Sequence, residues 1–170
     1  MNIFYLNNDP KTCAQMHNDS HCSKMIIEYA QLMSTAHRYL DGEFYYGKTA
    51  NGRKIQRWRL NSDLEHVLYK ASHINHPSGI WVRKSVSNYK RLYEMWTELN
   101  NEFMYRYNKD VPHESYRKLH EALEYIANYL DKTNNLKKQI IATLTYPVIV
   151  SLVGIMLIYV ILIFVAPTFK

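Results

Sequence analysis

The 170-residue sequence predicts a mainly α-helical protein: a helical cytoplasmic domain with a small β-hairpin, then a neck helix and one C-terminal transmembrane helix. Residues 148–166 carry no charged side chain, and as a helix they would span about 28 Å, close to the ~30 Å hydrocarbon thickness of a bilayer. Earlier in the chain, long stretches without Gly or Pro carry apolar residues at helical spacing. A core helix of a soluble protein rarely stays apolar on every face for 19 residues, which favours a transmembrane helix. The alternative is a helix buried inside a larger complex.

The distribution of positive charge predicts the orientation in the membrane. Lys137 and Lys138 directly precede the apolar stretch, whereas Lys170 alone follows it. Because excess Lys and Arg mark the cytoplasmic side, we expect a single-pass protein with its N-terminus in the cytoplasm and a very short tail outside. The stretch lies at the wrong end of the chain for a cleaved signal peptide.

The net charge of +6 is compatible with two kinds of partner, a nucleic acid or the anionic inner leaflet of a membrane. Two cysteines, Cys13 and Cys22, are too few for a disulfide scaffold, and in a cytoplasmic domain we expect free thiols. About 145 residues lie outside the apolar stretch, enough for one modest domain and a helical neck.

The first long helix is expected over residues 11–40, between the start signal Asp9-Pro10 and the stop signal Gly42. Apolar residues at helical spacing form its expected core stripe. These residues are Cys22, Met25, Tyr29, Leu32, Met33, Ala36 and Leu40.

A polar row on the same helix is the first candidate site. His17, His21, Lys24 and Glu28 follow i, i+4, i+7, i+11 spacing and would lie within about 60° of arc. Such a row can bind phosphate, hold a metal or transfer protons, and Glu28 would then be the general base or a ligand. An ordinary solvated face is the alternative. The spacing fixes no third metal ligand, so we predict no metal site.

Residues 43–60 predict a β-hairpin around an Asn51-Gly52 turn. The arm after the turn interleaves cations with an aromatic residue, a pattern that suits a nucleic-acid backbone with stacking on a base. A solvated edge strand protected by its charges is the alternative. The candidate nucleic-acid-binding residues are Arg53, Lys54, Arg57, Trp58 and Arg59.

A short helix over residues 61–70 leads to the third candidate site, a polar loop. His73, Asn75 and His76 are close in sequence and precede a helix expected from residue 79 or 80 to 107, with Ser78 as its cap. A polar loop at a helix N-terminus is a common anion site. We expect these three residues, with Arg83, to bind a ligand.

The polar segment 108–118, which contains Pro112, predicts the domain boundary. The expected division is a helical domain over 1–118, an amphipathic neck helix over 119–146 and a transmembrane helix over 147–167.

The first part of the chain, residues 2–118, resembles a family of small uncharacterised bacteriophage proteins. The resemblance lies in NIFYL at 2–6, CAQMH at 13–17, KMIIEYAQLMSTAHR at 24–38 and YKASHINHPSGIWVR at 69–83. The family implies no specific activity.

The last part is similar to the inner-membrane platform protein of type II secretion and type IV pilus assembly systems. The similar residues, 120–169, read HEALEYIANYLDKTNNLKKQIIATLTYPVIVSLVGIMLIYVILIFVAPTF. The resemblance implies a bacterial inner-membrane location and other transmembrane helices as partners. That family has further spans and a repeated helical domain, whereas only the end of one such unit is present here. Since the two resemblances belong to unrelated systems, we expect a chimera, natural or artificial, joined near residues 118–121.

Two functions follow as hypotheses. The first is a membrane-anchored phage-type domain that binds or acts on nucleic acid, a nucleotide or another phosphate-containing ligand. The alternative is a non-enzymatic inner-membrane module related to the secretion and pilus platform protein. The lipid bilayer is an expected partner in both, and the sequence leaves enzymatic activity and any cofactor open.

Overall fold

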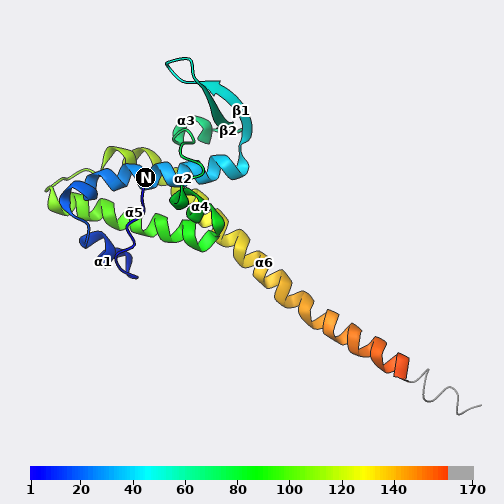
Figure 1. The fold of residues 1–170 in the computed structure, drawn as a ribbon. Helices are drawn as coiled ribbons and strands as arrows, with labels where there is room; N and C mark the ends of the chain where they lie inside the picture. Colours follow the sequence, from blue (N-terminus) through cyan, green and yellow to red (C-terminus); the bar gives the residue numbers. More distant parts are fainter. Residues whose placement is uncertain (161–170) are drawn as a thin grey trace, which may run out of the picture. The chain divides into compact units, whose positions relative to one another are not determined.

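The computed structural model describes residues 1–160 and is mainly helical, with one small antiparallel hairpin (Figure 1), as the sequence predicts. The chain divides into two compact units, residues 1–131 and residues 132–170. In chain order the elements are α1 (Pro10–Gln15), α2 (Asp19–Asp41), β1 (Glu43–Lys48), β2 (Lys54–Arg59), α3 (Leu64–Val67), α4 (Pro77–Lys84), α5 (Val86–Arg106) and α6 (Glu114–Val160).

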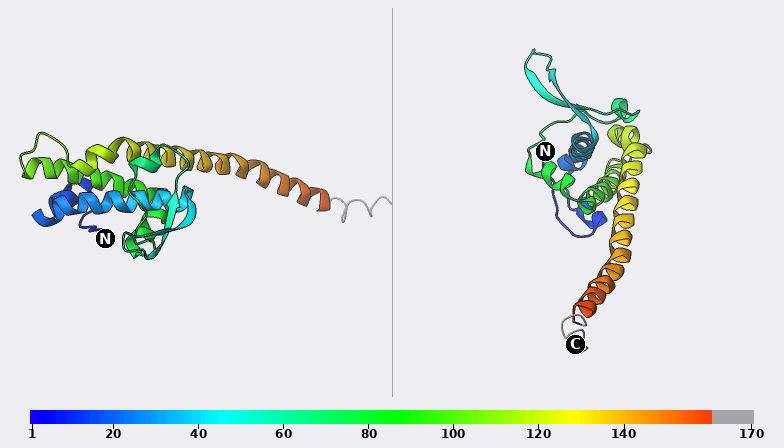
Figure 2. Two further views of the ribbon diagram at one scale, coloured as in Figure 1. Left: turned by 90° about the horizontal axis from the view of Figure 1, so that it is seen from above. Right: turned by 90° about the vertical axis from the view of Figure 1, so that its right-hand side faces the viewer.

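The core of the first unit forms where α2 and α5 lie side by side (Figure 2). Both helices bury an apolar stripe, and this removal of apolar surface from water is the main stabilising contribution. The indole Nε1 of Trp96 donates a hydrogen bond of 2.8 Å to the carbonyl of Ile26, so its polar atom is satisfied within the core. The largest buried hydrophobic side chains of the two helices are Met25, Ile26, Tyr29, Leu32, Met33, Leu92, Met95, Trp96 and Leu99.

The first turns of α6 belong to this core. Leu119, Leu123 and Ile126 are buried in it, and the ring of Tyr116 lies 4.6 Å from that of Trp96. The first compact unit therefore extends to Asp131, beyond residue 118. The expected functional division into segments 1–118, 119–146 and 147–167 stays a prediction.

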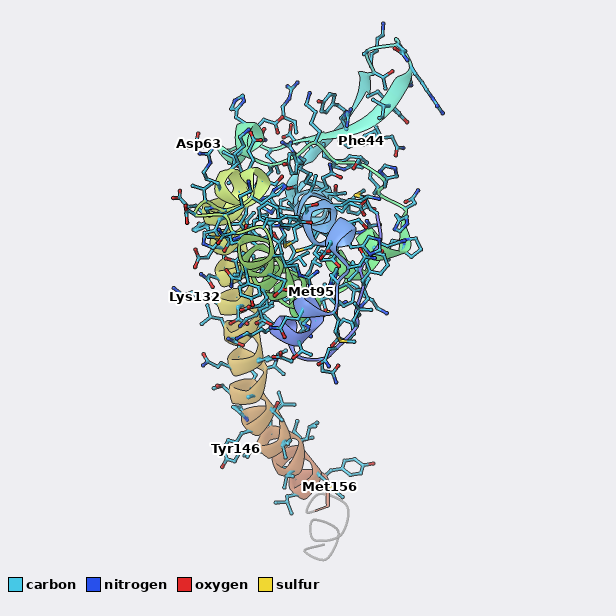
Figure 3. The ribbon with its side chains drawn as sticks, turned by 90° about the vertical axis from the view of Figure 1, so that its left-hand side faces the viewer. Phe44, Asp63, Met95, Lys132, Tyr146 and Met156 are labelled. Atoms are coloured by element: carbon cyan, nitrogen blue, oxygen red, sulfur yellow. The ribbon has the colours of Figure 1, made fainter. Side chains whose placement is uncertain are left out.

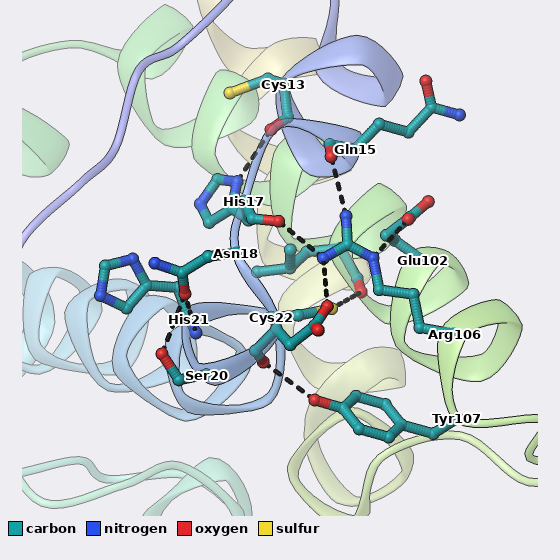
Figure 4. A network of polar contacts seen from close by, with 12 residues as sticks. Cys13, Gln15, His17, Asn18, Ser20, His21, Cys22, Glu102, Arg106 and Tyr107 are labelled. Atoms are coloured by element: carbon teal, nitrogen blue, oxygen red, sulfur yellow. Dashed lines mark hydrogen bonds and ion pairs between the residues drawn. The ribbon is translucent and has the colours of Figure 1, made fainter.

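The continuous helix expected over residues 11–40 is wrong, because the chain leaves the helical conformation between α1 and α2. Asn18 is extended there, and its side-chain oxygen caps α2 by accepting a 2.8 Å hydrogen bond from the His21 amide. Arg106, at the end of α5, donates to the carbonyls of Gln15 (2.7 Å) and His17 (2.6 Å), as Figure 4 shows. These bonds satisfy carbonyls left unpaired where α1 ends.

The helix expected over residues 79–107 is also divided. Ser85 is extended, and its hydroxyl caps α5 by accepting a 3.1 Å hydrogen bond from the Asn88 amide. The preceding helix α4 starts at Pro77, earlier than expected, and its cap is His76 instead of Ser78. The short helix expected over 61–70 is confined to Leu64–Val67. At α4 and α5 a polar side chain caps the start of the helix, whereas no side-chain hydrogen bond caps α3.

The hairpin follows the predicted pattern. Strands β1 and β2 pair in the register Phe44 with Trp58 and Lys48 with Lys54. Gly52 in the turn has a φ of 73°, which a glycine adopts without strain. Gly42 ends α2 as expected, and a side chain there would collide with the carbonyl of Arg38.

A buried arginine joins α2 to the hairpin and to the segment after it. Arg38 is 1% exposed, and its guanidinium is paired with the carboxylate of Glu65. The same carboxylate accepts a 2.9 Å hydrogen bond from the Leu60 amide. All the guanidinium nitrogens are occupied, because they also donate to the carbonyls of Trp58, Glu65, Leu68 and Tyr69.

The second unit, as far as the structure describes it, is the apolar continuation of α6. It is the part of residues 1–160 that is long and apolar enough to cross a membrane, with a mean hydropathy of 2.2 over its best window and none of that window buried. Tyr146 and Met156 stand out from the helix in Figure 3. The expected span over 147–167 lies partly outside the described residues.

Pro147 lies inside α6 without ending it. Nearby hydroxyls donate to carbonyls one turn earlier, among them Thr143 to Gln139 (2.9 Å) and Ser151 to Pro147 (2.7 Å). Proline and back-bonded Ser or Thr residues are both tolerated in membrane helices.

Replacing Arg38 by methionine should lower the free energy of unfolding by about 3–5 kcal/mol, the usual effect of removing one partner from a buried charge pair. The reason is that Glu65 and several buried carbonyls lose their donor. Chemical denaturation of the full chain in detergent, followed by tryptophan fluorescence, measures the change. The exposed Arg117→Met is the control and should change stability by less than about 0.5 kcal/mol. Equal effects of the two substitutions would contradict the structural role of Arg38.

Candidate functional site

A cavity of about 580 Å³ brings together residues from two of the three groups that the sequence singles out. Arg53 and Lys54, from the start of the basic arm, line it together with His73, Asn75 and His76. The remaining walls come from the hairpin turn, the first half of β2 and the segment 71–76. Parts of the two candidate groups therefore line one cavity, although sequence reasoning treats the groups separately.

The segment 71–76 is held in place from several sides. Arg57 Nη1 donates to the carbonyl of Ala71 (3.0 Å), and Arg83 Nη1 donates to that of Ile74 (2.6 Å). The hydroxyl of Thr35 on α2 lies within hydrogen-bonding distance of the Ser72 amide (3.3 Å). Arg83 is not among the residues that line the cavity, so the structure gives it a positioning contact with the loop.

Two details of the loop fix the geometry of its imidazoles. His73 has a φ of 50°, in the left-handed region that non-glycine residues seldom adopt. Its carbonyl accepts a 2.9 Å hydrogen bond from the His76 amide, which closes the turn. His76 Nδ1 accepts a 3.3 Å hydrogen bond from the Ser78 amide, so the neutral ring carries its proton on Nε2.

The remaining residues of the basic arm are engaged in the fold. Arg57 holds Ala71, and the guanidinium of Arg59 lies 5.1 Å from the centre of the Tyr45 ring. Trp58 packs between Phe44 (5.2 Å) and Tyr39 (5.5 Å) and is half-buried, so stacking on a base would require rearrangement. Arg53 and Lys54 line the cavity, whereas the other three residues of the arm do not. Nucleic-acid binding stays a prediction.

The polar row expected on the first helix is not assembled as one face. His17 precedes α2 and is 3% exposed, with Nδ1 2.8 Å from the Cys13 carbonyl and Nε2 3.1 Å from the Tyr29 hydroxyl. The ring of His21 stacks on Phe4 at 4.6 Å. The break at Asn18 turns His17 inward, where both ring nitrogens have structural partners.

Glu28 and Lys24 do lie on one face of α2, 3.6 Å apart. Glu28 also accepts a 3.3 Å hydrogen bond from the Asn2 amide and lies 3.7 Å from the amino group of Met1. These contacts hold the N-terminal segment on α2. A catalytic role for the row stays a prediction, and residues 1–160 contain no group of three or more His, Cys, Asp or Glu side chains arranged to hold a metal.

A second cavity, of about 590 Å³, has no counterpart in the sequence-based predictions. Tyr5, Trp81 and Arg91 line it. The Arg91 guanidinium already donates to the Asn7 carbonyl (3.0 Å) and lies 5.1 Å from the Tyr5 ring. The Arg91 cation is thus engaged within the fold, and so is that of Lys54 in the first cavity, whose ammonium lies 3.7 Å from the centre of the Tyr46 ring.

The comparison with known families finds a match for the C-terminal part of the chain. Residues 113–167 match the model of the family described as type II secretion system (T2SS), protein F. This match confirms the resemblance of the last part of the sequence and covers about a third of the chain. Neither a curated protein nor a solved structure matches the chain. The comparisons give no support to the bacteriophage resemblance, the chimera or nucleic-acid binding.

Three histidines, of which His17 is buried and His37 and His113 are partly buried, predict how stability depends on pH. Burial lowers the pKa of His17 below its ordinary value near 6.5, and the pKa values of His37 and His113 shift in the same direction for the same reason. The unfolded chain therefore binds protons more readily, and stability should fall as the pH drops through about 6.5. The melting temperature of the full chain in detergent should be lower at about pH 5.5 than at about pH 7.5.

His17→Gln should reduce this difference in melting temperature, because it removes one of the three groups. The exposed His66→Gln is the matched control and should leave the difference as it is. A difference unchanged by His17→Gln would show that His17 does not contribute.

Proposed function

We propose that this protein is a non-enzymatic inner-membrane module that packs its apolar helix against other transmembrane helices of a secretion or pilus assembly platform. The observation that carries the proposal is the family match over residues 113–167, which contains the exposed apolar part of α6. Such a large exposed apolar surface indicates contact with a membrane or with another protein. The Lys137-Lys138 pair before the span favours a cytoplasmic N-terminal unit.

One stripe of the helix is suited to close packing with a neighbour. Ser151 and Gly154 are three residues apart, so they lie on the same side of α6. A side chain added at Gly154 would meet nothing within 4 Å, and the Ser151 hydroxyl is turned back onto the Pro147 carbonyl. Small residues on one face of a helix let two helix backbones approach each other in a membrane.

Membrane insertion predicts the behaviour of the full chain on extraction. The protein should remain with bacterial membranes after alkaline carbonate treatment and dissolve only in detergent. Leu152→Arg together with Ile155→Arg should shift it to the carbonate-soluble fraction, because each charge near the middle of a span disfavours insertion by about 2.5–3.5 kcal/mol. The control is Leu136→Arg, outside the expected span. Full-length protein in the soluble fraction without detergent would refute the span.

Helix packing predicts the outcome of a cross-linking experiment in membranes that contain such a platform. The tagged full chain should co-purify with inner-membrane components of the assembly after cross-linking. Gly154→Leu should reduce the recovered partners several-fold by holding the helices apart. Ile149→Phe also adds bulk but lies on the opposite side of the helix, so recovery should persist. Recovery of the wild-type chain as a lone monomer would contradict the proposal.

A further inference from the structure

The geometry of the first cavity points to a further function, which does not depend on the proposed role of the membrane helix. We propose that the cavity lined by Arg53, Lys54, His73, Asn75 and His76 binds a phosphate monoester group. The ligand is either a small soluble ester or the headgroup of a phosphate-monoester lipid. Both sources present the same dianionic group to the protein.

Charge is the first reason. Among the residues that the structure describes, those lining the cavity include two permanent cations and no carboxylate. A phosphate monoester carries between about −1.5 and −2 charges at neutral pH, which two cations match. The charge of Arg53 and Lys54 is therefore uncompensated by the walls of the cavity, and an entering phosphate would neutralise it.

The second reason is the arrangement of hydrogen-bond donors. Asn75 and His76 line the cavity from the segment 71–76, and Arg53 and Lys54 line it from the hairpin. Because the Ser78 amide donates to His76 Nδ1, the free Nε2 of the neutral ring is a donor. A phosphate has three strong acceptor oxygens, so donors on two walls are the complementary arrangement.

The third reason is that the donor-bearing loop is already ordered. Arg57, Arg83 and Thr35 hold its backbone at Ala71, Ile74 and Ser72. His73 occupies a left-handed conformation, a kind of backbone strain that is found concentrated at ligand-binding sites. A loop held in this way loses little conformational freedom when a ligand binds, which favours affinity.

The size of the cavity indicates that the phosphate group belongs to a larger molecule. A volume of about 580 Å³ falls in the range of about 300–1,000 Å³ that is usual for small-molecule sites. It exceeds the space that a lone phosphate ion needs. Ile55 and Ile74 also line the cavity and supply apolar wall for the rest of the molecule. We therefore expect an organic ester to bind more tightly than inorganic phosphate.

The test is a calorimetric titration of the full chain in phosphatidylcholine nanodiscs. The soluble probes are adenosine monophosphate and inorganic phosphate, with adenosine as the uncharged control. A parallel arm incorporates phosphatidic acid into the nanodiscs and measures whether it competes with adenosine monophosphate. Saturable binding of adenosine monophosphate that phosphatidic acid leaves unchanged identifies a soluble ester; competition identifies the lipid headgroup.

Arg53→Gln combined with Lys54→Gln should weaken phosphate binding about tenfold or more, because charge-assisted hydrogen bonds are lost. The matched control, Lys84→Gln combined with Lys109→Gln, removes the same charge from exposed positions outside the cavity and should leave affinity within about twofold. His73→Asn keeps a residue type that tolerates the left-handed region and should weaken binding without lowering the melting temperature. Equal losses in the two double variants, or no saturable binding of any phosphate probe, would overturn the proposal.

Discussion

The architecture of the first unit depends on one fully satisfied guanidinium, that of Arg38. A charge buried to this degree is tolerated only when it is paired and every donor has an acceptor, and here the acceptors come from β2, α3 and the segment that follows α3. The segment after α3 leads directly to the cavity at residues 71–76. The hydrogen bonds of Arg38, near the end of α2, thus help to set the position of the candidate phosphate site.

Local features of the fold could be predicted from the sequence, whereas contacts between distant residues could not. The Asn51-Gly52 turn and the apolar periodicity of α2 and α5 are properties of short windows. The break between α1 and α2 depends on Arg106, which lies 89 residues beyond the His17 carbonyl that it binds. In the sequence of a helix, an arginine that will be buried looks the same as one that will be exposed to solvent. The structural roles of Arg38 and Arg106 could therefore not be predicted.

The candidate site shows the same division. The loop with His73, Asn75 and His76 could be identified as one group because its residues are adjacent in sequence. Its association with Arg53 and Lys54 required the hairpin to fold back beside it, and that depends on tertiary contacts such as Arg57 with Ala71. His17 was misplaced for a related reason: helical spacing places a residue on a face only if the helix is unbroken.

The segment that matches the secretion family begins within the first unit, where Ser115 and Leu119 are both buried.

The two thiols lie on either side of the α1–α2 junction and are completely buried. Cys13 Sγ lies 3.3 Å from the sulfur of Met95, and Cys22 is enclosed beside Leu99 on α5. Burial raises the pKa of the Cys22 thiol, which lowers the fraction of reactive thiolate. An alkylating reagent therefore reaches these sulfurs only during transient openings, so the rate of labelling reports how often α1 and the start of α2 separate from α5.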